Sequence, residues 1–429
     1  MIRRVRVQGY KSLADVSIEL KPLTVIFGPN AAGKSNLFDA LALLARTATH
    51  KTLRDAFEEH RGAPAEALFR DGKGADSLVN GATGRFTIEV DVQLSTDVVD
   101  SVERRIRLMV QDRSPQEGTD RSFRKRIQET LLRYGLTVEV APSTGFLRVA
   151  DERLVALNQH LEPSERRKPF IERIDRKLRL RLEGQAARPT GYDVGLDYTL
   201  LSQPLYPPHY PHIAALKEEL SRWRFYYLEP EAMRREVPPG EVLSLRRDGA
   251  DLAAFFKTLE ARNKPQFDAL IRSLRMLLPN VDELRLEQTR AGLLQLNVIE
   301  RGAAFPAHLI SEGTLRVLGL LAITNPASES TVVGYEEPEN GVHPRRLRLI
   351  AELLSNAAAR GMQLLVNTHS PILPSFFEDD SLVVCRRRDR QSEFLPFRSW
   401  GPLSRQSEID KALDETPLSE RIIRGDFDD

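Results

Sequence analysis

The sequence is poor in cysteine, with Cys385 as the single thiol in 429 residues. One thiol excludes an intrachain disulfide framework and a zinc site of the CxxC type, and it fits a reducing compartment. The net charge is only +1, so nucleic-acid binding would have to come from a local basic patch. No apolar run reaches the roughly 18 residues of a membrane-spanning helix, and residues 1–13 lack the apolar core of a signal peptide. We therefore expect a cytoplasmic protein with no membrane partner.

What the sequence does contain predicts an α/β fold. Hydrophobic residues make up 41% and charged residues 29%, as in ordinary globular proteins. Alternating or continuous apolar runs predict strands within residues 5–20, 23–27, 85–95, 331–335 and 362–368. Apolar residues at helical spacing predict helices within residues 36–46, 314–323 and 344–361, the last closed by Gly361. Strands alternating with helices favour a buried parallel sheet.

The predicted core is split into two parts, residues 1–98 and 226–400. Between them, residues 101–190 hold 20 Lys and Arg against 13 Asp and Glu, and the stretches 121–135 and 165–184 predict basic helices. We therefore expect residues 99–225 to form a basic, mostly helical insertion. Residues 401–429 form an acidic tail, which we expect to lie on the surface or to be disordered.

The strongest motif is GPNAAGKS, at residues 28–35, which follows an apolar strand and precedes a helix. Two glycines allow backbone conformations that a side chain would block, so that loop amides can point at phosphate oxygens. Lys34 would reach the β- and γ-phosphates of ATP, and the Ser35 hydroxyl would bind Mg²⁺. The expected nucleotide-binding residues of this loop are Gly28, Asn30, Gly33, Lys34, Ser35 and Asn36.

A pair of carboxylates, Glu336 and Glu337, ends a second predicted buried strand. Such groups are costly at this position unless they bind something, and a P-loop enzyme needs a second acidic site. Glu336 would hold Mg²⁺ through water, and Glu337 would act as general base on the attacking water. A surface-exposed pair is the alternative. A glycosidase pair is disfavoured, since adjacent strand residues point to opposite faces.

Four blocks together resemble the ABC-type ATPase heads of the RecF, SMC and OLD group. They are GYKSL…LTVIFGPNAAGKSNLFDAL, LISEGTLRVLGLL, YEEPENGVHP and VNTHSP. Together they cover roughly 100 residues toward both ends of the chain. The chain looks most similar to stand-alone bacterial OLD-like ATPases without a Toprim domain, and the resemblance implies an ABC-type head as the fold. Glu336 stands where the commoner residue is aspartate.

The resemblance assigns further roles. Ser311 and the amide of Gly313 fall in the signature motif and would contact the γ-phosphate held by a second copy, which implies a homodimer around two ATP molecules. A helix N-cap is the alternative reading of Ser311, and the two are compatible. His369 falls at the switch histidine that contacts the γ-phosphate; a structural histidine is the alternative.

The resemblance implies a dimeric ATPase that uses ATP and Mg²⁺ as a switch. The expected biological role is the ATPase component of a bacterial anti-phage system that controls a separately encoded effector, such as a nuclease or toxin. With about 50 residues after the strand around Cys385, we do not expect this chain to be a nuclease by itself. The alternative is a RecF-like repair ATPase whose basic insertion binds DNA. An ATPase subunit of a membrane transporter is disfavoured by the motifs.

Overall fold

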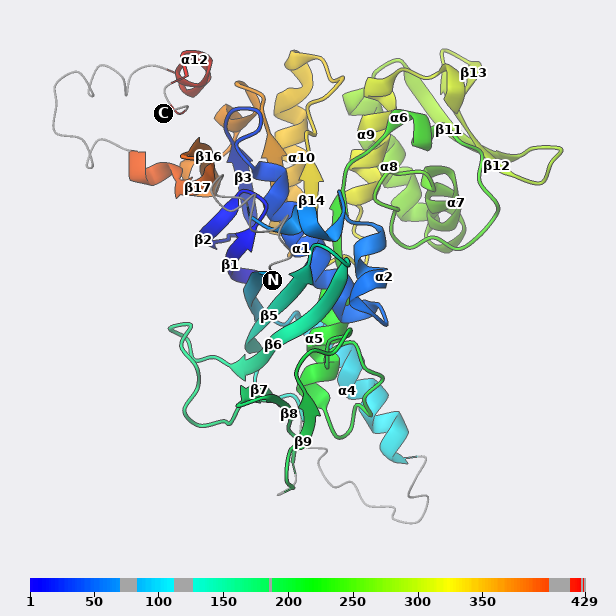
Figure 1. The fold of residues 1–429 in the computed structure, drawn as a ribbon. Coiled ribbons are helices and arrows are strands. Elements are labelled where there is room, and N and C mark those ends of the chain that lie inside the picture. Colours follow the sequence, from blue (N-terminus) through cyan, green and yellow to red (C-terminus); the bar gives the residue numbers. More distant parts are fainter. Residues whose placement is uncertain (70–82, 112–125, 185–186, 401–416, 426, 428–429) are drawn as a thin grey trace. The chain divides into compact units, whose positions relative to one another are not determined.

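The computed structural model describes residues 1–69, 83–111, 126–184, 187–400, 417–425 and 427 (Figure 1). The chain divides into two compact units, each assembled from several segments. The first comprises Met1–Lys21, Ser35–Trp223 and Arg387–Phe394, and the second Pro22–Lys34, Arg224–Arg386 and Leu395–Asp429. Within the described residues, no helix is both long and apolar enough to cross a membrane.

Four parallel strands form the centre of the second unit. Their order is β14 (Val332–Glu336), β15 (Gln363–Thr368), β3 (Leu23–Phe27) and β16 (Leu382–Arg388). Every residue of β14 and β15 is buried, as expected for parallel strands covered on both faces. The apolar runs that predicted strands at 331–335, 362–368 and 23–27 are therefore confirmed.

One face of this sheet carries the hydrophobic core of the second unit. Its strand residues include Tyr335, Val366 and Phe27, which alternate with residues that point to the opposite face. The helices of this unit are α6 (Pro230–Met233), α7 (Leu252–Arg262), α8 (Lys264–Leu277), α9 (Glu312–Ile323), α10 (Leu347–Ala359) and α12 (Leu418–Ile423). Single 3₁₀ turns are η2 (Ala307–Leu309), η3 (Pro344–Arg346), η4 (Leu373–Phe376), η5 (Asp379–Ser381) and η6 (Phe397–Trp400). The helices predicted at 314–323 and 344–361 correspond to α9 and α10, and Gly361 follows α10 with a φ of 100°.

A separate antiparallel sheet in the second unit has the order β11 (Val281–Gln288), β12 (Leu294–Glu300) and β13 (Ala303–Pro306). Helices α7 and α8 are distinct because Asn263 caps the second one, accepting a hydrogen bond from the Gln266 amide, and Pro265 lies in its first turn.

The first unit is built on an antiparallel sheet. Its order is β2 (Leu13–Glu19), β1 (Ile2–Tyr10), β4 (Gly84–Gln93), β5 (Leu131–Ala141), β6 (Phe146–Ala156), β7 (Ile171–Ile174), β8 (Lys177–Leu180) and β9 (Thr190–Asp193). Its helices are α2 (Leu53–Glu58), the 3₁₀ turn η1 (Pro64–Ala67), α4 (Thr96–Gln111) and α5 (Pro211–Ser221), and α1 (Lys34–Thr49) runs into it from the second unit. Two short strands, β10 (Trp223–Tyr226) and β17 (Gln391–Pro396), lie where the chain passes between the units.

The prediction of a mostly helical insertion is wrong for the described residues. The stretch 165–184 contains the hairpin β7–β8, with Asp175 at its turn in a left-handed conformation, and the described part of 121–135 leads into β5. Buried and partly buried residues alternate along all of β5. Charged residues on the outward face of the strands obscured this alternation in the sequence. A burial pattern with a period of two is typical of strands, not helices. The four-segment division of the chain stays a prediction.

The acidic tail also differs from expectation where it is described. Phe427 is buried, and its ring lies 5.6 Å from the ring of Phe27 and 6.0 Å from that of Phe397, between centroids. Helix α12 precedes it. The prediction considered only the charged residues of the tail, whereas the Phe427 ring contributes apolar contact area. Residues 401–416 of the predicted tail lie outside the described residues.

A buried carboxyl group in the first unit makes its stability depend on pH. Glu152, on β6, is fully buried, and its oxygens accept hydrogen bonds from the amides of Leu200 and Leu201 and from the Tyr134 hydroxyl. Burial raises the pKa of Glu152 from 4.5 to about 7, although the two amides act in the opposite direction. The folded chain therefore binds this proton more tightly than the unfolded chain. The resulting stabilisation is complete below pH 4.5 and is lost as the pH rises through about 7.

We expect Glu152→Gln to reduce this pH dependence. The free energy of unfolding of the parent should fall between about pH 5 and pH 8 by up to roughly 3 kcal/mol more than that of the variant. Denaturant unfolding at several pH values measures the difference. Glu58→Gln, an exposed change on α2, is the control and should behave as the parent does. Parallel pH curves for parent and Glu152→Gln would contradict the expectation.

Candidate functional site

The glycine-rich loop follows β3 and is shaped by close backbone contacts. Gly28 has a φ of 148°, and a Cβ placed there would lie 1.9 Å from the carbonyl oxygen of Cys385 on β16. Gly33 has a φ of 105°, and α1 begins at the next residue. Ala31 also has a left-handed φ, of 63°, which costs an alanine about 1 kcal/mol. Glycine at 28 and 33 was expected from the motif, whereas the strained Ala31 was not.

Lys34 lies over this loop and is buried. Its ammonium donates hydrogen bonds to the carbonyl oxygens of Gly28 at 2.7 Å and Pro29 at 2.8 Å. Burial lowers the pKa of Lys34, and the neighbouring Cys385, Glu337 and Glu339 oppose that shift. A cation beside a glycine-containing loop at the N-terminus of a helix is an arrangement that can bind phosphate.

The predicted carboxylates lie at the same edge of the sheet as the loop. In the parallel register Glu336 pairs with Asn367, and Thr368 with Phe27, so β14, β15 and β3 end side by side. Glu337 has a left-handed φ of 53°, which turns the chain out of β14, and its amide donates to the Asn367 carbonyl at 2.8 Å. The structure therefore brings Glu336 and Glu337 to the edge from which the loop leaves.

His369 contacts the predicted general base. Its Nδ1 lies 3.2 Å from Oε1 of Glu337, and the side chain is 39% exposed. The Asn340 amide group donates to the other oxygen of Glu337. These contacts are compatible with both readings, a switch histidine and a structural histidine at a strand end. Its role toward a γ-phosphate stays a prediction.

Glu339 takes part in this site, although sequence reasoning assigned it no role. Its Oε1 accepts hydrogen bonds from the Thr368 hydroxyl at 2.5 Å, the Ser370 amide at 3.1 Å and the His369 amide at 3.3 Å. The carboxylate thus holds the segment that carries His369. The signal was present in the sequence as a third acid in YEEPEN, but its partners lie about thirty positions further along the chain.

Ser311 is the N-cap of α9, as the alternative reading predicted. Its hydroxyl oxygen accepts from the Thr314 amide at 3.2 Å, and the side chain remains exposed. A Cβ at Gly313 would lie 2.1 Å from the carbonyl oxygen of Gly341, so only glycine permits this approach of α9 to the loop after β14. The expected contact of Ser311 and Gly313 with ATP stays a prediction.

The remaining predicted residues lie around the loop. Asn30 is exposed at its tip, and Ser35 is in the first turn of α1. The amide group of Asn36 donates to the Ser12 hydroxyl at 2.7 Å, within the first unit. Asn36 thus has a structural partner that the motif did not predict.

The residues present fit ATP with Mg²⁺. Glycines at positions 28 and 33 keep the two ends of the loop free of side-chain atoms, and Lys34 places a buried cation beside it. The described residues contain no cluster of three or more His, Cys, Asp or Glu that could hold a metal ion. Mg²⁺ does not require such a cluster, because it is usually held by one or two protein oxygens together with water and substrate phosphates.

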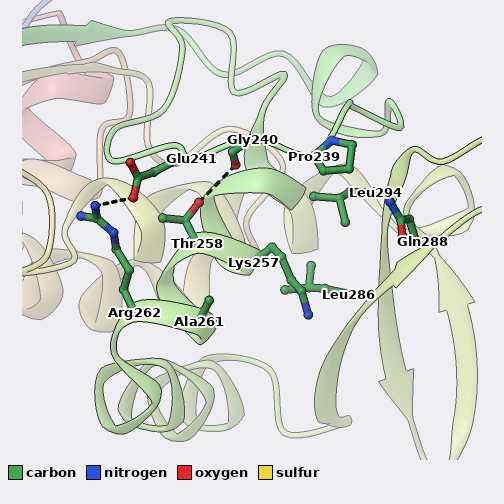
Figure 2. Close-up of a pocket in the computed structure, with 10 residues that line it drawn as sticks. All are labelled: Pro239, Gly240, Glu241, Lys257, Thr258, Ala261, Arg262, Leu286, Gln288 and Leu294. Atoms are coloured by element: carbon green, nitrogen blue, oxygen red, sulfur yellow. Dashed lines mark hydrogen bonds and ion pairs between the residues drawn. The ribbon is translucent and has the colours of Figure 1, made fainter.

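A pocket of about 500 Å³ lies elsewhere in the second unit and contains none of the predicted site residues (Figure 2). It is lined by α7, residues 239–241 and the facing ends of β11 and β12. Its charged groups are already paired: Arg262 with Glu241, and Lys257 with Glu260 at 3.0 Å. Paired charges do not favour binding of an anion, so this pocket does not compete with the loop as the nucleotide site.

The fold and the loop together define a class of protein. A GxxxxGKS loop between a buried parallel strand and a helix, with acidic residues ending a neighbouring strand, defines a P-loop ATPase of the RecF/SMC type. Comparison with protein families identifies the family of this chain. The model of the family described as "AAA domain, putative AbiEii toxin, Type IV TA system" matches residues 23–374, and the chain belongs to this family.

Individual relatives match smaller parts of the chain. The DNA replication and repair protein RecF of Gloeobacter violaceus is 31% identical over 105 residues, which cover 20% of this chain and 28% of the relative. RecF of Corynebacterium jeikeium is 34% identical over 62 residues, 14% of this chain and 15% of the relative. The chain therefore spans less than a third of the curated relatives it matches.

A solved structure agrees in fold. The crystal structure of an SMC head bound to the C-terminal winged-helix domain of ScpA has a TM-score of 0.51 at 13% identity, and the alignment covers 92% of this chain and 96% of that one. The predicted ABC-type α/β head is thereby confirmed at the level of the fold.

We expect Glu339→Ala to loosen the segment 368–370. It removes the acceptor of three donors, so the free energy of unfolding should fall by about 1–3 kcal/mol in denaturant titrations. Glu352→Ala is a matched control, because Glu352 is an exposed partner of Arg348 on α10 and its loss should cost less than about 0.5 kcal/mol. Equal losses for the two variants would show that Glu339 does not hold this segment.

Proposed function

We propose that this protein is an ATP-driven dimeric switch that controls a separate effector in bacterial defence against phage. The observation that carries the ATPase part is the meeting of three groups at one sheet edge. Lys34 lies over the glycine loop, close enough to Glu337 for their charges to interact, and Glu337 contacts His369. A cation for phosphate and a carboxylate for the attacking water are groups used in the hydrolysis of ATP, and His369 lies beside that carboxylate.

The roles follow from where these groups lie. Backbone amides of the loop Gly28–Gly33, other than Pro29, which has no N–H, and the ammonium of Lys34 bind the phosphates, and Ser35 with Glu336 holds Mg²⁺. The metal, when bound, neutralises charge that develops on the phosphate oxygens. Glu337 takes the proton of the attacking water, and its contacts with Asn340 and His369 fix the orientation of the carboxylate. His369, partly exposed, is placed to bond the γ-phosphate and report its loss.

A homodimer completes the site. Each chain has one glycine loop and one SEGT segment, and Ser311 presents its hydroxyl at the exposed N-terminus of α9. The end of a helix attracts anions. Two copies related by a two-fold axis can each offer this helix end to the ATP on the other, which gives a closed assembly. Binding of ATP closes the dimer and hydrolysis opens it.

The description of the family supports a role in defence. Its words name a toxin and a TA system, which by definition has two components. The description attaches the word toxin to the AAA-domain family itself, so it supports a role in defence but not a separate effector. We assign this chain the ATPase part because of its nucleotide-site residues, and propose a separately encoded nuclease or toxin as the effector. We place the switch in the cytoplasm, where the single thiol, Cys385, which is buried, would stay reduced.

A RecF-like role in DNA repair is the second candidate. Two RecF proteins match part of the chain, and the sheet of the first unit carries exposed basic residues on β6 and β8, among them Arg148, Lys177 and Arg179. Such residues could contact the phosphates of duplex DNA. Of the basic residues in the stretch 121–135, Arg124 and Lys125 lie outside the described residues, and Arg126 donates a hydrogen bond to the Pro208 carbonyl.

The switch is tested with Glu337→Gln, which keeps the size of the side chain but removes the base. ATP hydrolysis should fall by about 100-fold or more while ATP binding is kept, and ATP should then trap a dimer visible by light scattering. Ser311→Arg in the same background should prevent that dimer. Glu352→Gln on α10 is the control and should hydrolyse ATP as the parent does. A Glu337→Gln protein that hydrolyses ATP at the parental rate would overturn the assignment.

The partner is tested by purifying tagged Glu337→Gln protein from its native host. A stoichiometric companion with nuclease or toxin activity supports the defence role. Recovery of only DNA and repair proteins would replace that role with the RecF-like one.

The DNA-binding candidate has its own test. If it is correct, duplex DNA should bind with an affinity that falls steeply with salt concentration, and reversing Arg148, Lys177 and Arg179 to Glu should weaken binding by about 10-fold or more and flatten the salt dependence. Arg348→Glu, an exposed change on α10, is the control. Fluorescence anisotropy at several salt concentrations measures both quantities. Unchanged binding by the triple variant would remove the first-unit sheet as the DNA surface.

A further inference from the structure

Asn367 is a buried polar side chain whose hydrogen-bonding groups are all unused. It lies on β15, is 2% exposed, and neither its Nδ2 nor its Oδ1 has a hydrogen-bond partner among the described residues. Buried amide groups in folded proteins are nearly always bonded, because an unbonded one loses its hydration without replacement. An exception at the edge of a ligand site points to a ligand that supplies the missing bonds.

The strand register places Asn367 beside Glu336. The two residues pair across β14 and β15, and parallel strands lie about 4.8 Å apart, so their side chains are neighbours on one face. Ile26 of β3 is the next residue along the same row. Tyr335 and Val366, one residue earlier on each strand, point instead into the hydrophobic core.

The glycine loop lies over the face that Asn367 shares. Val383 of β16 pairs with Ile26, so Cys385, two residues further on, points to the same face. The thiol of Cys385 contacts the carbonyl oxygen of Ala32, in the middle of the loop, at 3.6 Å. The row Glu336, Asn367 and Ile26 therefore faces the side on which the loop would hold phosphates.

We propose that Asn367 is a positioning residue for the Mg²⁺ of the nucleotide site. With the metal bound, its Nδ2 would donate a hydrogen bond to the carboxylate of Glu336, a bond that the nucleotide-free chain does not make, and its Oδ1 would accept one from water at the metal site. This inference rests on the proposed ATPase function and adds to it Asn367, a residue of the block VNTHSP to which the sequence analysis assigned no role. A neutral amide suits the position, because it offers a donor to one carboxylate and an acceptor to water without adding a second negative charge.

The unbonded amide of Asn367 also affects the stability of the folded chain. Without nucleotide the unused amide destabilises the folded chain, and with Mg²⁺ bound it regains its hydrogen bonds. Replacing Asn367 with leucine, whose side chain has the same branched shape and the same number of heavy atoms, removes the polar atoms without opening a cavity. The same substitution at a buried asparagine whose side chain is already hydrogen-bonded should lower the stability. Asn297 on β12 is such a residue, since it is buried and its amide donates to Glu287 at 3.0 Å.

The test compares Asn367→Leu and Asn297→Leu with the parent. Binding of a fluorescent ATP analogue is titrated with Mg²⁺, and the melting temperature is measured without nucleotide. For Asn367→Leu we expect the Mg²⁺ concentration at half-maximal binding to rise by about 10-fold or more, with a melting temperature equal to or above that of the parent. For Asn297→Leu we expect an unchanged Mg²⁺ midpoint and a lower melting temperature.

Two results would overturn the inference. The first is an unchanged Mg²⁺ midpoint in Asn367→Leu. The second is a fall in its melting temperature as large as that of Asn297→Leu, which would show that Asn367 is bonded in the nucleotide-free protein. The parent reports separately on the proposed function. If the parent binds the analogue in a Mg²⁺-dependent manner, failure of Asn367→Leu to shift the midpoint counts against Asn367 alone, whereas a parent that binds no nucleotide overturns the site and this inference with it.

Discussion

The register of β14, β15 and β3 is the constraint on which the whole site depends. Parallel hydrogen bonding sets Glu336 level with Asn367, and Thr368 level with Phe27, the last residue before the glycine loop. A slip of one residue would turn every side chain of a strand to the other face and would bury the carboxylate in the hydrophobic core. Both faces of these strands are buried, so their apolar residues stabilise this register. The register in turn determines where the polar groups at the strand ends lie.

Backbone strain is concentrated at this same edge. Gly28, Ala31 and Glu337 have φ angles of 148°, 63° and 53°, and the two residues that are not glycine lose about 1–2 kcal/mol each by adopting a left-handed conformation. The regular, buried strands that lead to these residues provide the compensating stability. A sharp turn at Glu337 has a clear geometric result, since it ends β14 and directs the carboxylate toward His369 rather than along the strand.

The parts that sequence predicted well are those encoded by neighbouring residues. The glycine loop, the pair Glu336 and Glu337, and the buried strands each have a local pattern, and the register then joins them. The roles of Glu339 and Asn367 could not be recognised in this way, because each depends on a neighbour about thirty residues away in the sequence. The strands β5, β7 and β8 were missed for another reason: abundant outward-facing charges suggested helices, while the alternation of Ile171, Leu178 and Leu180 is that of a strand.

The loop formed by residues 337–341 connects His369 with the N-terminus of α9 in the second unit. Residues 337–341 begin with the carboxylate beside His369, continue with Glu339, which holds the amides of His369 and Ser370, and end at Gly341, whose carbonyl group packs against Gly313 of α9. The contact of Glu337 with His369 joins two side chains, whereas the contacts of Glu339 and of Gly341 involve backbone atoms, which cannot adjust as a flexible side chain can. A movement of His369 must therefore displace this loop or break its hydrogen bonds, and a displaced loop must move the N-terminus of α9. Helix α9 and His369 are thus joined by contiguous contacts within one chain, which is the physical requirement for a change at one to reach the other.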